Sequence, residues 1–238
     1  MIDFHSHILP AMDDGSKNIE ESLKLLKLLA EQGIHKVVAT PHFYANDESV
    51  VEFLGRRRAA YDRLREALPE GMPEIVEGAE VRYYQGISRL PDLKALCMEG
   101  SNLLLLEMPS SRWTDYMVKE IEDLSGRGNL TLVLAHVERY MELQSRRVRD
   151  RILDCGVLMQ VNADFFLGFG GGRKALRLLA DQTVQLIGSD CHDLNHRPPR
   201  IGAAMEQIRK KLGSGFLDEL NAFEESLFDR KAAKLILS

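Results

Sequence analysis

The chain has few cysteines, no surplus of basic residues and no long hydrophobic run, and each lack excludes a class of protein. Its three cysteines include no closely spaced pair, which predicts a reducing cytoplasm rather than a disulfide framework or a zinc ribbon. Thirty-one Lys and Arg against 36 Asp and Glu give a net charge of −5, which argues against a nucleic-acid partner. No apolar run approaches the roughly 18 residues that cross a bilayer, so we expect no membrane insertion. The first residues carry neither the basic nor the apolar region of a signal peptide.

The composition that remains is that of an ordinary globular protein. Hydrophobic residues make up 45% and charged residues 28% of the 238 residues, which excludes disordered and collagen-like chains. This length suits one barrel-sized domain or two small ones. Because no linker-like segment or internal repeat divides the chain, we predict a single domain over residues 1–238.

Short apolar runs alternate with amphipathic stretches along the chain. The runs are rich in Val, Ile and Leu, as in parallel strands that are buried on both faces. They cover residues 1–4, 36–40, 74–78, 103–106, 130–135, 157–161 and 184–187. Helical patterns lie between them, at residues 18–32, 48–68, 113–127, 141–155 and 173–181.

This β-α alternation predicts a parallel sheet. At this length it favours a closed or nearly closed α/β barrel, and an open doubly wound sheet is the alternative. A break at residues 212–215 separates two C-terminal helices, which we expect to cap the barrel.

Histidines and carboxylates stand where the apolar runs end. Six of the seven predicted strands finish this way, and barrel enzymes build their active sites at the carboxyl ends of their strands. The side chains in question are His5, His7, His42, Glu80, Glu107, His136, Asp190 and His192. Asp14 follows in the first loop and joins them as a ninth candidate.

The spacing and type of these residues point to a metal cluster. His5 and His7 are two residues apart on an extended backbone, which places both rings on one face, and Asp190 and His192 repeat that spacing. Glu80 ends an apolar run, where a bare buried carboxylate is costly unless a metal neutralises it. Five histidines and four carboxylates suit two or three ions, of Mn²⁺, Fe or Zn²⁺ rather than Ca²⁺ or Mg²⁺.

The charge of such a cluster suggests its substrate. Three divalent ions and four carboxylates leave a charge of about +2, which suits a phosphate ester. Clustered metals hydrolyse such esters by activating a bound water and clamping the attacking and leaving oxygens. Arg139 and Arg197 follow His136 and His192 closely and would lie at the same mouth, where guanidinium groups grip phosphate oxygens.

At this point the sequence resembles a known family, the PHP (polymerase and histidinol phosphatase) superfamily. Within it, the chain resembles the manganese-dependent bacterial tyrosine-protein phosphatases of capsular and exopolysaccharide clusters. The segments that carry the resemblance are His5-Ser6-His7, the Asp-Asp-Gly-Ser-Lys of residues 13–17, Gly78-Ala79-Glu80, the Ala-His-Val-Glu-Arg-Tyr of residues 135–140, and residues 189–199. It extends from Met1 to about Pro199 and so covers most of the chain.

The resemblance implies a distorted TIM-like (β/α)7 barrel of the PHP fold with three metal ions, most often Mn²⁺. One ion would be held by His5, His7, Glu80 and Asp190. Glu80 would bridge to a second ion, bound also by Glu107 and His136. Asp14, His42 and His192 would hold the third.

The same resemblance implies the chemistry and the partner. A metal-bridging hydroxide would attack phosphorus in line, while Arg139 and Arg197 bind the phosphoryl group and stabilise the transition state. The phosphorylated partner would be an autophosphorylating bacterial tyrosine kinase of polysaccharide export. No feature of the sequence predicts an oligomeric state.

Three alternatives remain at this stage. Cys191 and Arg197 have the C-x5-R spacing of cysteine-dependent tyrosine phosphatases, although the residues between them are not the small ones that such a loop needs. A small-molecule phosphatase of the same superfamily, such as a histidinol-phosphate phosphatase, would carry almost the same metal ligands. A metal-binding barrel that only scaffolds a partner is the third alternative. The glycine-rich segment 165–172 matches no motif, and we interpret it as a mobile loop before a helix.

Overall fold

The computed structural model describes residues 1–229 and has the alternating order of strands and helices that the sequence predicts. The strands are β1 (Ile2–Ser6), β2 (Lys36–Ala39), β3 (His42–Phe43), β4 (Glu74–Glu77), β5 (Glu80–Arg82), β6 (Leu103–Glu107), β7 (Thr131–Leu134), β8 (Leu158–Asn162) and β9 (Leu186–Gly188). The α-helices are α1 (Ile19–Glu31), α2 (Val50–Glu66), α3 (Asp115–Ser125), α4 (Arg146–Asp154), α5 (Ala163–Leu167), α6 (Gly171–Ala180), α7 (Ile201–Leu212) and α8 (Ser214–Ser226). Short 3-10 helices are η1 (Ile87–Arg89), η2 (Leu93–Leu96), η3 (Val137–Arg139) and η4 (Met141–Leu143).

No helix among the described residues is long and apolar enough to cross a bilayer. The single domain predicted over residues 1–238 includes residues 230–238, which lie outside the described part of the chain, and it stays a prediction.

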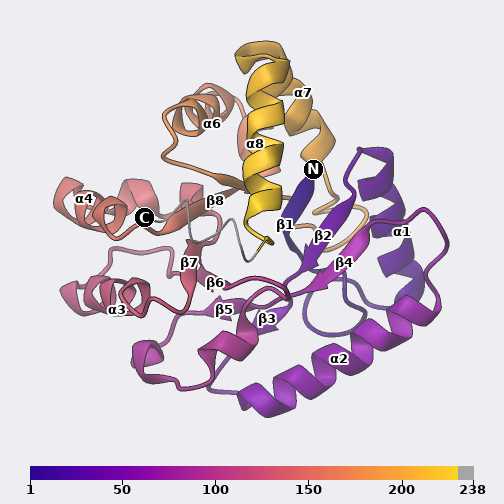
Figure 1. The fold of residues 1–238 in the computed structure, drawn as a ribbon, viewed down its shortest axis with the longest axis horizontal. Helices are drawn as coiled ribbons and strands as arrows, with labels where there is room; N and C mark the ends of the chain where they lie inside the picture. The colour runs from indigo at the N-terminus through magenta and orange to yellow at the C-terminus, as the bar shows by residue number, and fades with distance from the viewer. Residues whose placement is uncertain (230–238) are drawn as a thin grey trace.

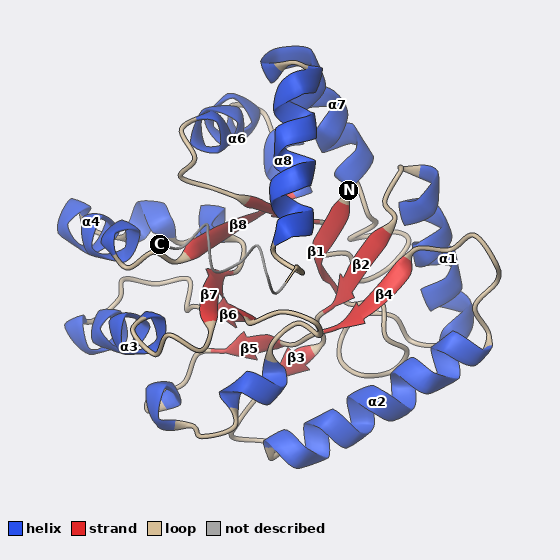
Figure 2. Ribbon diagram, viewed as in Figure 1, coloured by secondary structure: helices blue, strands red, loops and turns tan. Residues whose placement is uncertain are grey.

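The strands form a ring around which the helices lie (Figures 1 and 2). All pairs of neighbouring strands are parallel, in the orders β1-β2-β4 and β3-β5-β6-β7-β8-β9. The two sheets are continuous along the chain, because β3 follows β2 and β5 follows β4 after two residues each. At the other edge, the N–H of Asp190 donates to the carbonyl of His5 (2.7 Å) and that of His7 to the carbonyl of Cys191 (2.9 Å). These bonds join the first and last strands, so the fold is a barrel and the open-sheet alternative is wrong.

Two of the predicted strands are interrupted, which the apolar pattern did not indicate. Pro41 has no N–H to donate and ends β2, yet pairing resumes at His42. Gly78 and Ala79 interrupt the neighbouring strand at the same level, and Glu80 opens β5. His42 and Glu80 therefore begin short second strands that pair with each other, rather than standing beyond the ends of the first ones.

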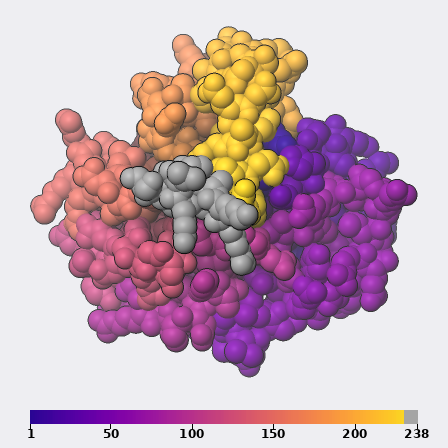
Figure 3. Space-filling model, in the orientation of Figure 1, coloured from indigo at the N-terminus to yellow at the C-terminus, as the bar shows by residue number. Residues whose placement is uncertain are grey.

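The interior of the barrel is filled by alternate residues of the strands. Phe4, Val38, Leu105 and Val133 belong to one buried cluster there, which Leu227, the residue directly after α8, closes at the amino end. The opposite faces of the strands pack against the helices in a larger cluster. As expected, α8 caps the barrel: its C-terminal end reaches over the ring of strands in Figure 1, and Figure 3 shows the helix (yellow) on the face toward the viewer.

An irregularity in β1 directs the first histidine inward. The register between β1 and β2 slips by one residue between Asp3 and Ser6, which is a β-bulge. Such bulges re-aim side chains and are frequent beside active sites. Gly188 of β9 permits the close approach of β1, because a Cβ there would lie 2.5 Å from the Cβ of His5.

Helices α1 to α4 begin at residues whose side chains cap them, whereas α5 to α8 have no side-chain cap hydrogen bond. Asn18 accepts a hydrogen bond from the N–H of Glu21, and Ser49 forms a capping box with Glu52. The loop expected over residues 165–172 is shorter than predicted, since α5 extends to Leu167 and α6 starts at Gly171. The reason is Phe166, which is buried in the core and holds this turn of helix in place.

Candidate metal centre

The predicted histidines and carboxylates converge at the carboxyl ends of the barrel strands. The β1 segment supplies two of them, the loop before α1 supplies one, and the ends or starts of strands supply the others. They are His5 and His7 (β1 and the residue after it), Asp14 (loop), His42 (β3), Glu80 (β5), Glu107 (β6), His136 (after β7), and Asp190 and His192 (after β9).

Glu80 lies at the centre of this group. Its Oε2 is 3.1 Å from His5 Nε2, 3.3 Å from His7 Nε2 and 3.1 Å from His42 Nδ1. Its Oε1 is 2.8 Å from His136 Nε2. The side chain is 1% exposed, so four imidazole rings surround a carboxylate that has almost no contact with water.

Asp190 occupies a similar position at the closing edge of the barrel. Its Oδ1 lies 3.5 Å from the Nε2 atoms of both His5 and His7. Its Oδ2 accepts hydrogen bonds from Asn162 Nδ2 (2.7 Å) and Arg139 Nη2, and it forms an ion pair with Arg197 Nη2 (2.6 Å). One carboxylate thus touches both the histidine cluster and the two predicted phosphate-binding arginines.

The backbone is strained at two of the candidate ligands. His136 has φ 34° and Asp190 has φ 51°, both in the left-handed region that non-glycine residues rarely adopt. Such strain persists only where the surrounding structure enforces it, and it is frequent at functional sites. Here it turns both side chains toward the barrel axis directly after their strands end.

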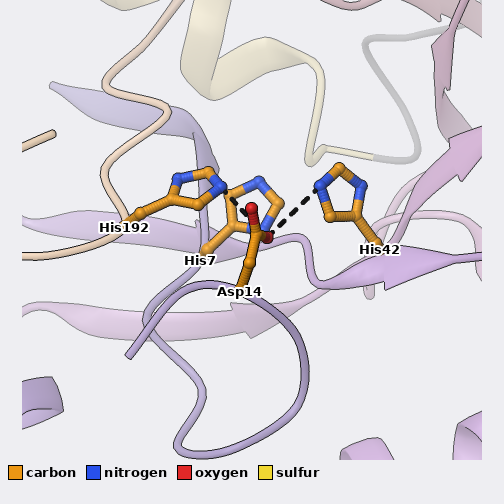
Figure 4. Close-up of side chains that lie close together, drawn as sticks. All are labelled: His7, Asp14, His42 and His192. Carbon is orange, nitrogen blue, oxygen red and sulfur yellow. Dashed lines mark ion pairs between the residues drawn. The ribbon is translucent and has the colours of Figure 1, made fainter. Parts of the chain in front are cut away.

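Asp14 stands at the outer rim of the group (Figure 4). Its Oδ1 is 3.6 Å from His42 Nε2 and 3.4 Å from His192 Nε2, and its side chain is 66% exposed. In Figure 4 the rings of His192 and His42 flank the Asp14 carboxylate, and His7 lies behind it.

Potential ligand atoms of these residues form four overlapping groups, within each of which all atoms lie within 4.8 Å of one another. The groups are His7–Asp14–His42–His192, His5–His7–Asp190, His5–Glu80–His136 and His42–Glu80–Glu107. All nine predicted ligands occur in at least one group. These groups differ from the ligand sets implied by the family resemblance. His7 lies with Asp14, His42 and His192, and His42 also lies with Glu80 and Glu107.

The hydrogen bonding of these rings fits a bound cation. Among the described residues, His42 Nδ1, His136 Nδ1 and His192 Nε2 are buried and make no hydrogen bond. Buried polar atoms of native proteins nearly always have a partner. Of these atoms, His42 Nδ1 faces Glu80 (3.1 Å) and His192 Nε2 faces Asp14 (3.4 Å). Imidazole nitrogens beside carboxylates are the ligands that Mn²⁺, Fe and Zn²⁺ accept, so the residues present fit such a group.

The pKa shifts of the buried histidines and carboxylates also indicate a site that attracts positive charge. Burial opposes protonation of His7, but hydrogen bonds with Asp13, Asp190 and Glu80 raise its pKa well above the usual value. Burial likewise favours the neutral form of Glu80, yet His5 and His136 hold the pKa of that carboxyl well below its usual range. Glu80 is therefore ionised, and its charge attracts protons or metal ions to the rings around it.

Two supporting interactions were not predicted from the sequence. Asp13 Oδ2 accepts from His7 Nδ1 (2.7 Å) and from the N–H of His42 (2.8 Å), which fixes the orientation of both. Gln160 Oε1 accepts from the N–H of His136 (2.8 Å) and lies 3.2 Å from His5 Nδ1. A polar residue inside the apolar run of β8 is the signal that could have revealed Gln160.

The two arginines line a cavity beside the metal centre. Arg139 and Arg197 are each 39% exposed and meet at Asp190 Oδ2. The cavity has a volume of about 230 Å³. Its walls are formed by Glu138, Arg139, Asn162, Asp164, Phe165, Ser189, Asp190, Arg197 and Pro198.

Cys191 lacks the properties of a nucleophile. Its side chain is completely buried, and burial raises the pKa of its thiol to about 12. A thiol of this pKa is protonated at neutral pH and does not attack phosphorus. The C-x5-R spacing of Cys191 and Arg197 is therefore a coincidence of sequence.

A parallel α/β barrel with clustered imidazoles and carboxylates at the carboxyl ends of its strands is the architecture of barrel metallohydrolases. This chain belongs to the family "Capsular polysaccharide synthesis, CpsB/CapC", whose family model matches residues 1–226. It is 30% identical over 225 residues to the tyrosine-protein phosphatase YwqE of Bacillus subtilis, which covers 90% of this chain and 86% of that protein. It is 32% identical over 242 residues to the tyrosine-protein phosphatase CpsB of Streptococcus pneumoniae, with 92% and 94% covered.

Solved structures agree with this family. A structure from the work on YwqE of Bacillus subtilis and CpsB of Streptococcus pneumoniae, described as metal-dependent tyrosine phosphatases, matches with a TM-score of 0.78 and 27% identity. That match covers 96% of this chain and 94% of the other. Histidinol phosphate phosphatase of Lactococcus lactis matches with a TM-score of 0.57 and 14% identity over 90% and 93% of the two chains, which shows a shared fold. The predicted family and PHP-type barrel are thus confirmed.

Proposed function

We propose that this protein is a metal-dependent phosphatase that hydrolyses phosphotyrosine in proteins. The observation that carries the proposal is the position of Arg139 and Arg197 at Asp190, which is itself a member of the buried cluster of candidate ligands. This arrangement supports a role for the two guanidinium groups in binding a phosphoryl oxygen beside the proposed metal ions. Membership in a family whose relatives are named tyrosine-protein phosphatases supports the substrate class.

Nine side chains would hold the metals, which we propose to be three Mn²⁺ ions. They are His5, His7, Asp14, His42, Glu80, Glu107, His136, Asp190 and His192. When bound, such ions supply a hydroxide nucleophile at neutral pH and neutralise charge that develops on phosphorus. The mixture of imidazole and carboxylate ligands favours Mn²⁺, Fe or Zn²⁺ over Ca²⁺ and Mg²⁺.

The protein's own contribution is to bind and orient the phosphoryl group. The Nη2 atoms of Arg139 and Arg197 both reach the position of one carboxylate oxygen, so an anionic phosphoryl oxygen placed nearby receives two charge-assisted hydrogen bonds. These bonds strengthen as negative charge grows on that oxygen in the transition state. Asp13 and Gln160 keep the imidazole rings in one orientation throughout.

The partner that we propose is a tyrosine-phosphorylated protein, specifically an autophosphorylated bacterial tyrosine kinase of polysaccharide export. The capsular polysaccharide family of this chain supports that choice. The three cysteines are unpaired, in keeping with the reducing cytoplasm in which we propose that the enzyme acts.

Phosphate release measured side by side from a phosphotyrosine peptide and from histidinol phosphate tests this function. The purified protein is assayed with added Mn²⁺ and, as a control, after treatment with a chelator. We expect fast release from the peptide, loss of that release in chelator, and recovery when Mn²⁺ is returned.

Other outcomes would contradict specific parts of the proposal. Release mainly from histidinol phosphate would keep the site but replace the substrate. Release that is indifferent to chelation would overturn the metal mechanism. A protein with full metal content and no turnover on either substrate would favour a scaffolding role.

A further inference from the structure

A second and larger cavity lies outside the metal centre, between α4 and α6. It has a volume of about 410 Å³. We call it the α4–α6 groove, and its main walls are Met141, Arg149, Leu153, Phe165, Arg177 and Leu178. In Figure 1 these two helices lie on the same side of the barrel.

The groove adjoins the cavity that holds the paired arginines. Glu138 and Phe165 line both of them, so each of these side chains has one surface toward the groove and one toward the mouth of the metal centre. A polypeptide whose phosphotyrosine occupies the mouth can therefore continue into the groove without crossing another part of the surface.

The charges around the groove favour an acidic occupant. Lys174 pairs with Glu142, and Arg146 lies 3.7 Å from Asp150, so these four charges balance. Arg149 donates to the carbonyl of Gln144, and it has no carboxylate within salt-bridge distance among the described residues. Arg177 is exposed and likewise has no ion-pair partner in the described chain. Two guanidinium groups thus remain against the one other carboxyl of the groove, that of Glu138, so cationic side chains outnumber acidic ones there.

The floor of the groove is apolar. Met159, Leu178 and Val184 line it, and Leu153 on α4 is 47% exposed beside them. An exposed leucine next to an apolar cavity with a charged rim is typical of a surface that binds another polypeptide.

We propose that the α4–α6 groove binds the acidic stretch of polypeptide that flanks the phosphotyrosine of the substrate. This inference rests on the proposed function, because it assigns to the groove the remainder of the same substrate. The groove distinguishes an acidic protein segment from free phosphotyrosine, which is too short to extend beyond the mouth.

Peptide kinetics with charge variants test this inference. Three substrates are compared with Mn²⁺ present: free phosphotyrosine, a phosphotyrosine peptide with Glu and Asp on both sides, and the same peptide with Gln and Asn instead. The variants are Arg177→Glu in the groove, Arg177→Lys as the conservative change, and Arg147→Glu as a matched control. Arg147 is also exposed and lies on α4, but it does not line the groove.

The expected result is a change in selectivity. In Arg177→Glu, the ratio of kcat/KM for the acidic peptide to that for free phosphotyrosine falls about tenfold, because like charges oppose each other across the interface. The loss arises in KM, not in kcat. It is absent for the neutral peptide, small in Arg177→Lys and absent in Arg147→Glu.

Several results would overturn the inference. An equal effect of Arg147→Glu and Arg177→Glu would show general attraction to the surface in place of a groove. A wild-type enzyme that hydrolyses acidic and neutral peptides equally well would show that the flanking charge is not recognised. Failure to release phosphate from all three substrates would overturn the proposed function, and this inference with it.

Discussion

Arg139 and Arg197 both form ion pairs with Oδ2 of Asp190. Substitution of either arginine therefore tests its proposed role in binding the phosphoryl group. Lysine keeps the positive charge but cannot present two parallel N–H groups to a phosphoryl oxygen. We therefore expect Arg139→Lys and Arg197→Lys each to lower kcat/KM on a phosphotyrosine peptide by about 10²-fold, the effect of losing one transition-state donor. Steady-state kinetics on the purified variants measure this.

The metal content of the same variants shows whether the arginines bind phosphate or instead position Asp190 as a metal ligand. If the arginines bind phosphate, Arg139→Lys retains the full complement of Mn²⁺, which atomic emission measures. Loss of metal in parallel with activity would show that Arg139 acts through Asp190 instead. Arg147→Lys, at an exposed site on α4, is the matched control and should behave as wild type.

Cys191 provides a second prediction at this scale. Because its thiol is buried and protonated, Cys191→Ser should keep activity within about twofold of wild type, whereas Asp190→Ala should lose nearly all of it. Turnover per folded molecule is the measurement, since a buried hydroxyl costs about 1–3 kcal/mol of stability when it lacks a partner. A Cys191→Ser protein that folds but is inactive would restore the cysteine mechanism.

Among the elements, β8 supports the metal centre through the two polar residues of its sequence, Gln160 and Asn162. Gln160 accepts from the N–H of His136, and its Nε2 donates to Asn162 Oδ1 (3.0 Å), whose Nδ2 in turn donates to Asp190. One strand thus connects candidate ligands that follow β7 and β9. This chain of hydrogen bonds fixes the direction in which both ligands point.

Replacing Gln160 should therefore weaken metal binding without removing a ligand. We expect Gln160→Leu to lower Mn²⁺ affinity by about 10- to 100-fold, as loss of a partner of metal ligands typically does. Competition with a chelator measures the affinity, and circular dichroism checks the fold. Gln160→Glu keeps an acceptor for the His136 N–H, so its Mn²⁺ affinity should lie between those of Gln160→Leu and the wild type. Equal affinities in all three proteins would refute the role.

The positions of strands and helices could be predicted where a hydrophobic pattern repeats. Interruptions that depend on single residues could not. The apolar runs predicted all seven strand positions, and the caps at Asn18 and Ser49 mark the starts of α1 and α2. The interruptions at Pro41 and Gly78 were missed because a short break does not disturb an apolar average. The bulge in β1 was missed because register depends on the partner strand, which periodicity does not describe.

At the scale of the whole molecule, α8 closes the amino end of the barrel with a buried acid. Glu224 accepts from the N–H of Ile2 (3.3 Å), and burial raises the pKa of its carboxyl from 4.5 to about 8. The folded state therefore favours the protonated form. The resulting stabilisation is complete below about pH 4.5 and is lost as pH rises to about 8.

Glu224→Gln should remove this loss, because an amide does not ionise. A pKa difference of one corresponds to about 1.4 kcal/mol, so we expect the variant to gain a few kcal/mol over wild type above pH 8 and little at pH 5. Urea unfolding at pH 5, 7 and 8.5 measures the difference. Glu219→Gln, at an exposed site on the same helix, is the control. A gain that is equal at all three pH values would contradict the ionisation argument.

The convergence of the site could be predicted at this scale because it follows from topology. Parallel strands in one barrel bring their carboxyl ends together, so the residues that follow them meet, whatever the details of packing. The two cavities could not be predicted, since they depend on how η3, α4 and α6 pack against one another. The supporting roles of Asp13 and Gln160 likewise depend on individual side-chain contacts that spacing does not determine.

The hydrogen bonds that join β1 to the segment after β9 also determine when the site can form during synthesis of the chain. His5 and His7 meet Asp190 only after β9 has joined β1, so this part of the proposed site is incomplete in every shorter nascent chain. At about 5–20 residues per second, the ribosome needs roughly 10–40 seconds to extend the chain from the first of these ligands to the last. During that interval the edge of β1 is unpaired on one side. A metal ion that needs His5, His7 and Asp190 together is therefore bound only after the barrel has closed.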